Sequence, residues 1–188
     1  MKPARLRSLS SAGGIALLLT GCLTIPPRPV EADGTYCHRV GKVSRQKLTC
    51  TVDLVPPASV EAGAKLFVAV PDAATLYILR SGRADGPNRV PVSIDGGRPT
   101  VTIPVSLMRV RLPPGEHELA LDWEGKRVLR TINSRAGAVN FIEIDASVWA
   151  WAASYGWSEV DAKDVRGKAV KAKLIADLDL RSTPAPRK

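Results

Sequence analysis

The chain is poor in the side chains that most often carry out chemistry at active sites. Among its 188 residues there are two histidines, His38 and His117, and three cysteines. No GxSxG, P-loop, GxGxxG or CxxC motif occurs, so no common catalytic or nucleotide-binding signature is present. His38 is adjacent to Cys37, but no second His or Cys stands at a metal-ligand spacing. We therefore expect a non-enzymatic protein without a cofactor or a metal.

His117 is the residue around which an active site would have to be built. It follows the Pro113-Pro114-Gly115 turn and begins a strand pattern, where its ring is expected to bond a neighbouring backbone carbonyl or carboxylate. A catalytic base needs a nucleophile and an orienting acid beside it. Ser106 and Asp122 could be neighbours in a folded sheet, but nothing in the sequence selects them. A small hydrolase with a site at His117 stays an alternative.

Long hydrophobic runs are also missing, and the apolar stretch near the N-terminus is short. The first seven residues, MKPARLR, carry three cations and no acid, and the thirteen residues that follow, 8–20, are uncharged. Such a stretch is too short to span a bilayer as a stable helix and is typical of a signal peptide. Residues 1–21 are therefore assigned to a signal peptide and left out of the fold.

Cys22 follows this stretch in the sequence Leu19-Thr20-Gly21-Cys22, which resembles the lipobox of bacterial lipoproteins. In that family the cysteine receives a diacylglycerol, and a peptidase cuts the chain in front of it. The resemblance implies a mature chain that starts at Cys22 and is held on a membrane by acyl chains such as palmitate. Leu23, in place of Asp, favours the outer membrane, facing the periplasm. An ordinary secretory signal, with Cys22 at its cleavage site by chance, is the alternative.

The two remaining cysteines, Cys37 and Cys50, are separated by twelve residues. In an exported protein an even pair of cysteines predicts a disulfide. Closing a loop of this size stabilises a fold by about 3 kcal/mol in the chain-entropy model. We expect the pair to staple a hairpin formed by residues 36–57, behind a Pro-rich tether of residues 22–35.

Positive charge is in surplus, with a formal net charge of +9. A basic balance suits anionic lipids or envelope glycans, whereas nucleic acid is not expected because no recognition motif is present. Part of the surplus falls on a predicted helix over residues 158–174. Its cations are Lys163, Arg166, Lys168, Lys171 and Lys173. This basic row predicts contact with anionic groups, and an ordinary solvated helix face is the alternative.

Short alternating segments separated by turn residues fill the body of the chain. Strand patterns run over residues 75–79, 90–94, 100–103, 106–112, 117–123, 127–132 and 139–144. Strands that recur every 8–12 residues, with Gly- and Pro-containing turns between them, predict a β-sandwich. A short helix is expected over 58–67, with Ser59 as its cap. We therefore predict one mainly β domain over 58–176, closed by the C-terminal helix, and a disordered tail over 177–188.

Four of the nine aromatic residues fall in one segment, Trp149, Trp151, Tyr155 and Trp157. Residues two apart in a strand point to the same face, so Trp149 and Trp151 would form a pair there. Such a pair can stack on a ligand or lie at the headgroup level of a membrane. The alternative is that the rings fill the core of the sandwich or the seam under the helix.

Several of these segments follow one another in the order of a known family. The stretches AATLYILRSG, VSIDGG, LPPGEHELAL and NFIEID, followed by a late helix, resemble the bacterial lipoprotein family called Domain of Unknown Function 2846. The matching positions are Tyr77, Arg80, Asp95, Gly96, Leu112 to Gly115, His117 and Phe141 to Ile144. The resemblance covers roughly residues 72–174 and does not include the cysteine hairpin. It implies a transthyretin- or immunoglobulin-like sandwich on a lipid anchor and brings no activity with it.

Together these features predict a membrane-anchored envelope lipoprotein whose sandwich is a non-catalytic binding or structural module. Its partners are expected to be the membrane, envelope proteins or anionic glycans. A small enzyme inhibitor is the alternative, because a disulfide hairpin can present a rigid loop. The tip of that hairpin would carry Lys42, Arg45 and Lys47.

Overall fold

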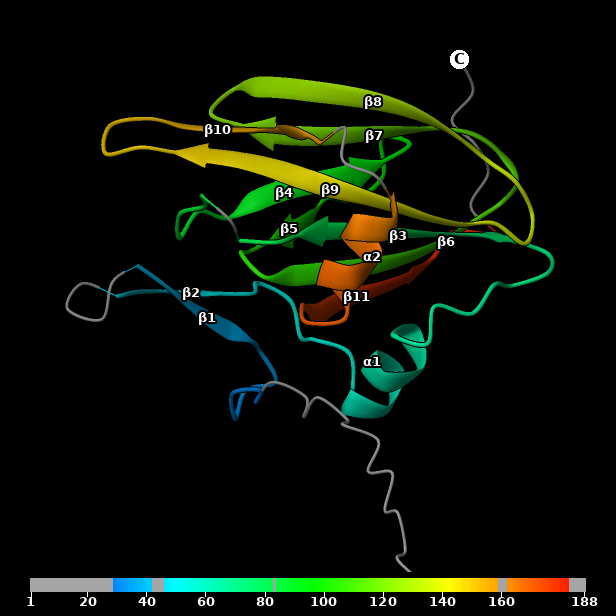
Figure 1. Ribbon diagram of the computed structural model, residues 1–188, viewed down its shortest axis with the longest axis horizontal. Coiled ribbons are helices and arrows are strands. Elements are labelled where there is room, and N and C mark those ends of the chain that lie inside the picture. Colours follow the sequence, from blue (N-terminus) through cyan, green and yellow to red (C-terminus); the bar gives the residue numbers. More distant parts are fainter. Residues whose placement is uncertain (1–28, 42–45, 83, 159–161, 183–188) are drawn as a thin grey trace, which may run out of the picture.

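The structure is a computed structural model that describes residues 29–41, 46–82, 84–158 and 162–182. The lipobox and Cys22 lie outside these residues, as do Lys42 and Arg45 of the predicted hairpin tip. The described chain is mainly β, with two short helices, and its strands form two stacked sheets beside a small hairpin (Figure 1). This confirms the predicted sandwich.

One layer is a five-stranded sheet with the order β10-β9-β3-β6-β11. Its strands are β3 (Ala74–Arg80), β6 (Ser106–Leu112), β9 (Val139–Val148), β10 (Ala153–Trp157) and β11 (Lys173–Asp179). The other layer is a four-stranded sheet with the order β5-β4-β7-β8. Its strands are β4 (Val90–Ile94), β5 (Thr100–Thr102), β7 (Gly115–Trp123) and β8 (Lys126–Ser134). The short strand β5 and the last strand β11 are therefore both edge strands.

Two hairpin turns show why these strands start and stop where they do. Asp95 and Gly96 have φ angles of 50° and 69°, and Glu124 and Gly125 have φ angles of 47° and 75°. Two successive residues with positive φ are typical of the turns whose twist matches that of paired strands. In both turns the second residue is glycine, which adopts a positive φ without steric cost, and in the first turn Asp95 also tolerates this conformation.

The core lies between the two sheets, where every second residue of the strands points inward. Its buried members include Leu76, Ile78, Val92, Val110, Leu119, Leu121, Ile142 and Ile144. A second apolar cluster lies on the outer face of the five-stranded sheet. There Tyr77 and Leu79 pack against Ala64 of α1 (Ala58–Ala64) and Val165 of α2 (Ala162–Ala169). The two helices thus cover part of that face.

The chain around the two helices departs from the prediction. The helix expected over 158–174 ends at Ala169, and β11 follows it and pairs in parallel with β6. Pairing with the open edge of β6 outweighs the helical spacing of small residues. Residues 177–179 consequently belong to the sandwich and not to a tail. At α1, Pro57 occupies the N-cap position and no side chain caps the helix, so the predicted role of Ser59 is wrong.

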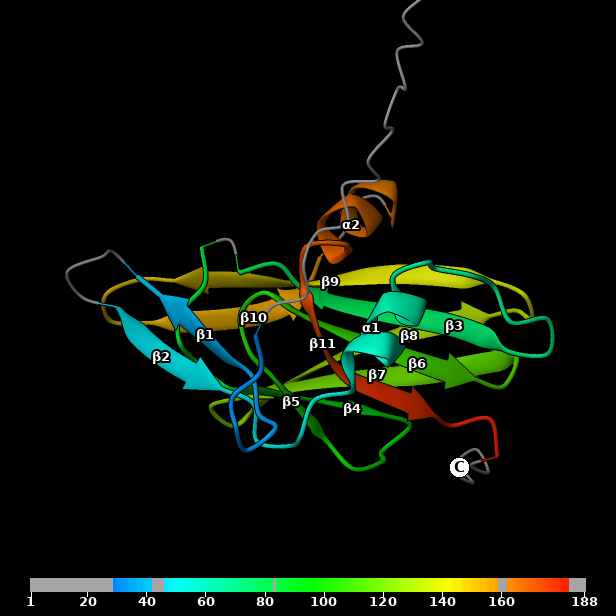
Figure 2. The same ribbon diagram turned by 90° about the horizontal axis from the view of Figure 1, so that it is seen from below.

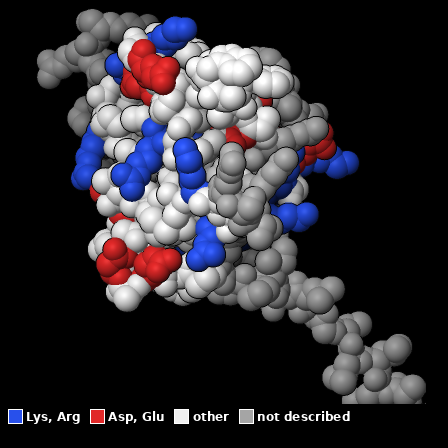
Figure 3. Space-filling model, turned by 90° about the vertical axis from the view of Figure 1, so that its left-hand side faces the viewer, with Lys and Arg blue, Asp and Glu red and all other residues white. Residues whose placement is uncertain are grey.

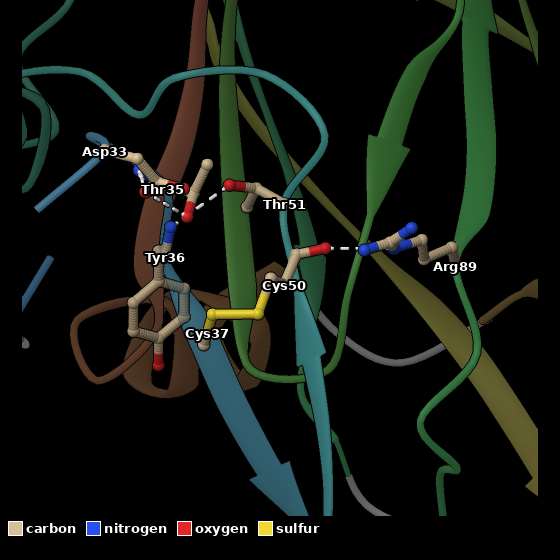
Figure 4. Close-up of a disulfide and its surroundings, with 7 residues drawn as sticks. All are labelled: Asp33, Thr35, Tyr36, Cys37, Cys50, Thr51 and Arg89. Carbon is tan, nitrogen blue, oxygen red and sulfur yellow. Dashed lines mark hydrogen bonds between the residues drawn. A yellow bond between two sulfur atoms is a disulfide. The ribbon is translucent and has the colours of Figure 1, made fainter. Parts of the chain in front are cut away.

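The predicted hairpin is present as β1 (Cys37–Val40) and β2 (Lys47–Cys50), and Cys37 and Cys50 form the predicted disulfide (Figure 4). The two cysteines face each other in the strand register. The hairpin is joined to the sandwich through Tyr36, which is buried in the core and donates its backbone N–H to the Thr51 hydroxyl at 3.1 Å. Arg89 adds a hydrogen bond to the carbonyl of Cys50 at 3.0 Å.

Candidate functional site

Trp149 and Trp151 lie on the surface, in the turn between β9 and β10. The turn is closed by a hydrogen bond from the Trp149 N–H to the Ala152 carbonyl at 2.8 Å. The two side chains are 71% and 89% exposed, respectively. They do not share one face of a strand, as the spacing had predicted, because residues 149–152 belong to neither strand. Exposed large apolar side chains in a short turn do little for folding and are a sign of a contact with something else.

Tyr155 and Trp157, in contrast, point into the sandwich from β10. Tyr155 is buried and packs edge-on against Trp123, with ring centroids 5.0 Å apart. Trp157 is half-buried and donates its indole N–H to the Val128 carbonyl at 3.1 Å. The four aromatic residues therefore fall into two groups. Trp149 and Trp151 are exposed, as a surface contact requires, whereas Tyr155 and Trp157 pack against the core of the sandwich.

A buried ion pair lies beneath this hairpin. Arg80 donates two hydrogen bonds of 2.7 Å to the carboxylate of Asp85, and both side chains are fully buried. Its other guanidinium nitrogen reaches the carbonyls of Asn88 and Thr102 at 2.9 and 3.0 Å. The Tyr155 hydroxyl donates to Asp85 at 3.1 Å, and burial raises the pKa of Tyr155 to about 12. Because its charges are paired, this cluster holds the loop before β4 in place.

The end of the molecule that carries the Trp149 turn is also basic. The end of β1 and the start of β2 lie on the same side of the molecule as the β9–β10 turn, on the left in Figures 1 and 2. Exposed cations on β1, β2 and the loop before β4 are Arg39, Lys47 and Arg89. Figure 3 looks onto this end, where Lys and Arg side chains lie across the surface and acidic side chains lie mainly toward its margins. This end therefore combines exposed indole rings with positive charge.

The basic row predicted on the C-terminal helix is only partly an exposed surface. Lys163, Arg166 and Lys171 are exposed. Lys168 pairs with Glu143 at 2.7 Å, and Lys173, at the start of β11, is buried against Glu61 of α1.

The pairing of Lys173 has a structural role. Burial would raise the pKa of Glu61, but hydrogen bonds from Lys173 and Lys65 outweigh it and hold the pKa below its ordinary value. Glu61 therefore stays ionised and ties α1 to β11. Because Lys173 is buried, the prediction that it belongs to a basic surface for anionic partners is wrong.

His117 is held in the way that the sequence suggested. Its ring is 4% exposed, with Nδ1 at 2.7 Å from a carboxylate oxygen of Asp95 and Nε2 at 2.8 Å from the Pro113 carbonyl oxygen. A general base needs a free ring nitrogen, and both are engaged. Ser106 donates its hydroxyl to the Ile103 carbonyl at 2.5 Å, and Asp122 lies 3.8 Å from Arg127. The three residues of the hydrolase alternative thus have separate partners.

A cleft of about 600 Å³ with a mainly apolar lining lies between the edge strand β11 and strands β4 and β5. We call it the β11 cleft. One wall is formed by residues 175–178 and 180, the other by β4 and the β4–β5 hairpin. Residues 51 and 53–56, on the segment that leads from β2 to α1, line its third side, and this segment passes β5 and β4 in Figure 2. No sequence pattern predicts the cleft, because its walls come from segments far apart in the chain and residues 177–180 were expected to belong to a tail.

The charged side chains of the β11 cleft have partners within the protein. Arg98 pairs with Asp53 at 3.0 Å, and Asp95 accepts hydrogen bonds from His117 and from the backbone N–H of Glu118. Asp177 receives two hydrogen bonds from Arg109, at 2.8 and 2.6 Å. Burial would raise the pKa of Asp177, but the hydrogen bonds and charge of Arg109 hold it below its ordinary value. The cleft is therefore a mainly apolar space with a neutralised rim.

Neither a membrane-spanning helix nor a metal cluster is found among the described residues. No helix in this part of the chain is long and apolar enough to cross a bilayer. Likewise, no group of three or more His, Cys, Asp or Glu side chains within it is placed to hold a metal ion. No protein-family model matches this chain, and a search of curated proteins finds no match for it. Membership of the lipoprotein family that its motifs resemble therefore stays a prediction.

Proposed function

We propose that this protein is a lipid-anchored module of a bacterial cell envelope, without catalytic activity, which holds its tryptophan-bearing end against the membrane. The observation that carries the proposal is the exposure of Trp149 and Trp151 in an uncharged turn. Indole rings are enriched at the headgroup level of membranes, where one part of the ring is in apolar surroundings and the N–H is hydrated. The protein would thus have two membrane contacts, acyl chains on Cys22 and the Trp turn.

The anchor supplies most of the attraction. Each buried methylene of an acyl chain contributes about 0.8 kcal/mol, and two chains hold a protein on a membrane almost permanently. Pro29 is the seventh residue after Cys22, so the linking segment can span at most about 25 Å. The folded domain is then kept close enough to the lipid for weak contacts to form. Each cation near an anionic leaflet adds about 1 kcal/mol, which suits Arg39, Lys47 and Arg89.

The disulfide supports an exported location. Disulfides such as Cys37–Cys50 form and persist in oxidising compartments, including the bacterial periplasm. Leu23 favours the outer membrane, so we place the domain on the periplasmic side of that membrane. Envelope proteins and anionic glycans are its proposed partners there.

The anchor is tested by changing Cys22→Ser in the full chain and separating membranes from soluble proteins. We expect the wild type in the membrane fraction and the variant in the soluble fraction, with the mass of the acyl groups lost. A matched control replaces Cys37→Ser and Cys50→Ser, which removes the disulfide but leaves the lipobox intact. This control should remain in the membrane fraction. Retention of the Cys22→Ser protein on the membrane would refute the anchor.

A further inference from the structure

We propose that the β11 cleft is a binding site for a single acyl chain of a lipid. The proposal deepens the module function given above, and it rests on that function for the membrane as the source of the lipid.

Most of the lining is hydrocarbon. Its apolar members include Leu54, Val92, Val101, Ile175, Ala176 and Leu180. Pockets of 300–1,000 Å³ with such linings are typical of sites for small apolar ligands, and the β11 cleft falls in this range at about 600 Å³. Leu54 lines the cleft and is 69% exposed, which puts apolar surface at its opening as well. Burying this surface against an apolar ligand would be favourable.

The polar groups of the cleft select against a charged ligand. Asp53 is paired with Arg98, Asp95 with His117, and Asp177 with Arg109. A ligand that brings its own charge or hydrogen-bonding groups into the cleft would have to displace one of these pairs or leave its own groups unpaired. An acyl chain carries no such groups along its length. An extended peptide carries an N–H and a carbonyl at nearly every residue and could pair them with the free edge of β11, so it is the competing occupant that the test below distinguishes.

The length of the cleft also fits an acyl chain. Its wall follows the last strand and the residue after it, from Ile175 to Leu180, which are five steps apart. At about 3.3 Å per step this wall is roughly 17 Å long. The hydrocarbon core of a bilayer is about 30 Å thick, so the acyl chains of one leaflet span about 15 Å. One extended acyl chain therefore matches the wall.

The binding test uses the full chain with Cys22→Ser, which removes the protein's own acyl groups as competitors. The probe is 11-(dansylamino)undecanoic acid, a fatty acid whose emission rises and shifts to the blue in apolar surroundings. We expect saturable binding, and displacement by both palmitate and lysophosphatidylcholine if the site takes the acyl chain irrespective of its headgroup. Displacement by palmitate alone would assign the source to free fatty acids rather than phospholipids, and it would still support the site.

Two substitutions are designed to fill the cleft. Ala176→Trp and Val101→Trp place a large ring on opposite walls, and each is expected to weaken probe binding by about tenfold or more. Leu129→Trp is the matched control, because Leu129 is 53% exposed on β8, at the far edge of its sheet, and is outside the cleft lining. Thermal unfolding of all three variants identifies any that fails to fold. If one cleft variant does not fold, the variant on the opposite wall still tests the site.

Several outcomes would overturn the proposal. They are the absence of saturable binding, equal binding by the folded cleft variants and the wild type, and displacement by an extended apolar peptide but not by palmitate. The last of these would assign the cleft to a protein partner that pairs with the free edge of β11. Because binding is measured without a membrane, its failure is distinguishable from failure of the Cys22 anchor.

Discussion

The two halves of the aromatic segment, the turn with Trp149 and Trp151 and the strand with Tyr155 and Trp157, have opposite surroundings. The turn exposes its rings to solvent, whereas β10 places its rings against the sandwich core and the buried Arg80–Asp85 pair. Four aromatic residues within nine positions thus serve two purposes. The strand half contributes to stability, and the turn half is the part that we propose to contact lipid. This contrast makes opposite predictions for substitutions in the two halves.

The largest effect is expected under the strand half, at the buried ion pair. Arg80→Met removes the guanidinium that neutralises Asp85 and leaves a carboxylate without its charge partner in the protein interior. Breaking a buried pair in this way costs about 3–5 kcal/mol of unfolding free energy. Guanidinium chloride unfolding measures the loss. Arg98→Met is the control, since its pair with Asp53 is exposed and should contribute little.

An equal response of the two arginine variants would contradict this assignment. It would mean that the charge network beneath the hairpin is not a main support of this end of the sandwich. The Trp149 turn would then have to be held mainly by the strand pairing of β9 with β10.

The next effect is expected at Tyr155, whose hydroxyl completes the same network. Tyr155→Phe keeps the ring contact with Trp123 but removes the hydrogen bonds with Asp85, Asn88 and Arg80. We expect a loss of about 1–3 kcal/mol at neutral pH, because polar partners are left unsatisfied in a buried place. Chemical unfolding at neutral pH measures it, and a change within error would show that water replaces the hydroxyl without cost.

The same variant has a distinct dependence on alkaline pH. The pKa of Tyr155 is about 12 in the folded protein and about 10 in an unfolded chain. Between these values the unfolded state loses the proton while the folded state keeps it, so the unfolding free energy of the wild type falls as pH rises. By about pH 12 the drop is about 2 kcal/mol.

Tyr155→Phe lacks this contribution, so the stability difference between the two proteins should narrow from pH 10 to pH 12. Tyr77, whose pKa burial also raises, is present in both proteins and cancels. A constant difference across this range would contradict the assignment of the pKa of Tyr155.

Much of the sandwich follows from local patterns. Strands β4 and β6 have the predicted bounds, 90–94 and 106–112, because alternation and turn residues mark both of their ends. The Cys37–Cys50 disulfide was predictable as well, because the assignment of Cys22 to a lipobox leaves two cysteines to pair. The strand bounds depend on a few neighbouring residues, and the disulfide depends on the number of cysteines.

The remaining features depend on tertiary contacts that no short pattern records. Strand β11 was not predicted: its first two residues were assigned to a helix and its last three to a tail. Its pairing partner β6 is more than sixty residues away in the sequence, so no local pattern marks it. The burial of Lys173 depends in the same way on Glu61 of α1. The division of the aromatic segment depends on where β9 ends, which a run of Ser, Val, Ala and Trp does not reveal. The β11 cleft could not be predicted either, because its lining residues come from segments far apart in the sequence.

The smallest effect on stability, and the largest on membrane contact, is expected for the turn half. Trp149→Ser with Trp151→Ser should change the unfolding free energy by no more than about 0.5 kcal/mol per site, since both rings are exposed. In vesicles of phosphatidylethanolamine and phosphatidylglycerol with brominated acyl chains, the acylated wild type should show quenched tryptophan fluorescence. The double variant, which retains Trp123 and Trp157, should lose most of this quenching.

Leu129→Ser is the matched control for this comparison, because it also removes an exposed apolar side chain but from β8. It should leave the quenching unchanged. Co-flotation with the vesicles separates the two proposed membrane contacts, since acyl chains on Cys22 would keep every variant on the lipid whether or not the turn touches it. Unchanged quenching in the double variant would therefore refute the docking of the turn while leaving the anchor intact. Quenching that disappears without a loss of stability would show that the exposed half of the segment serves the membrane and not the fold.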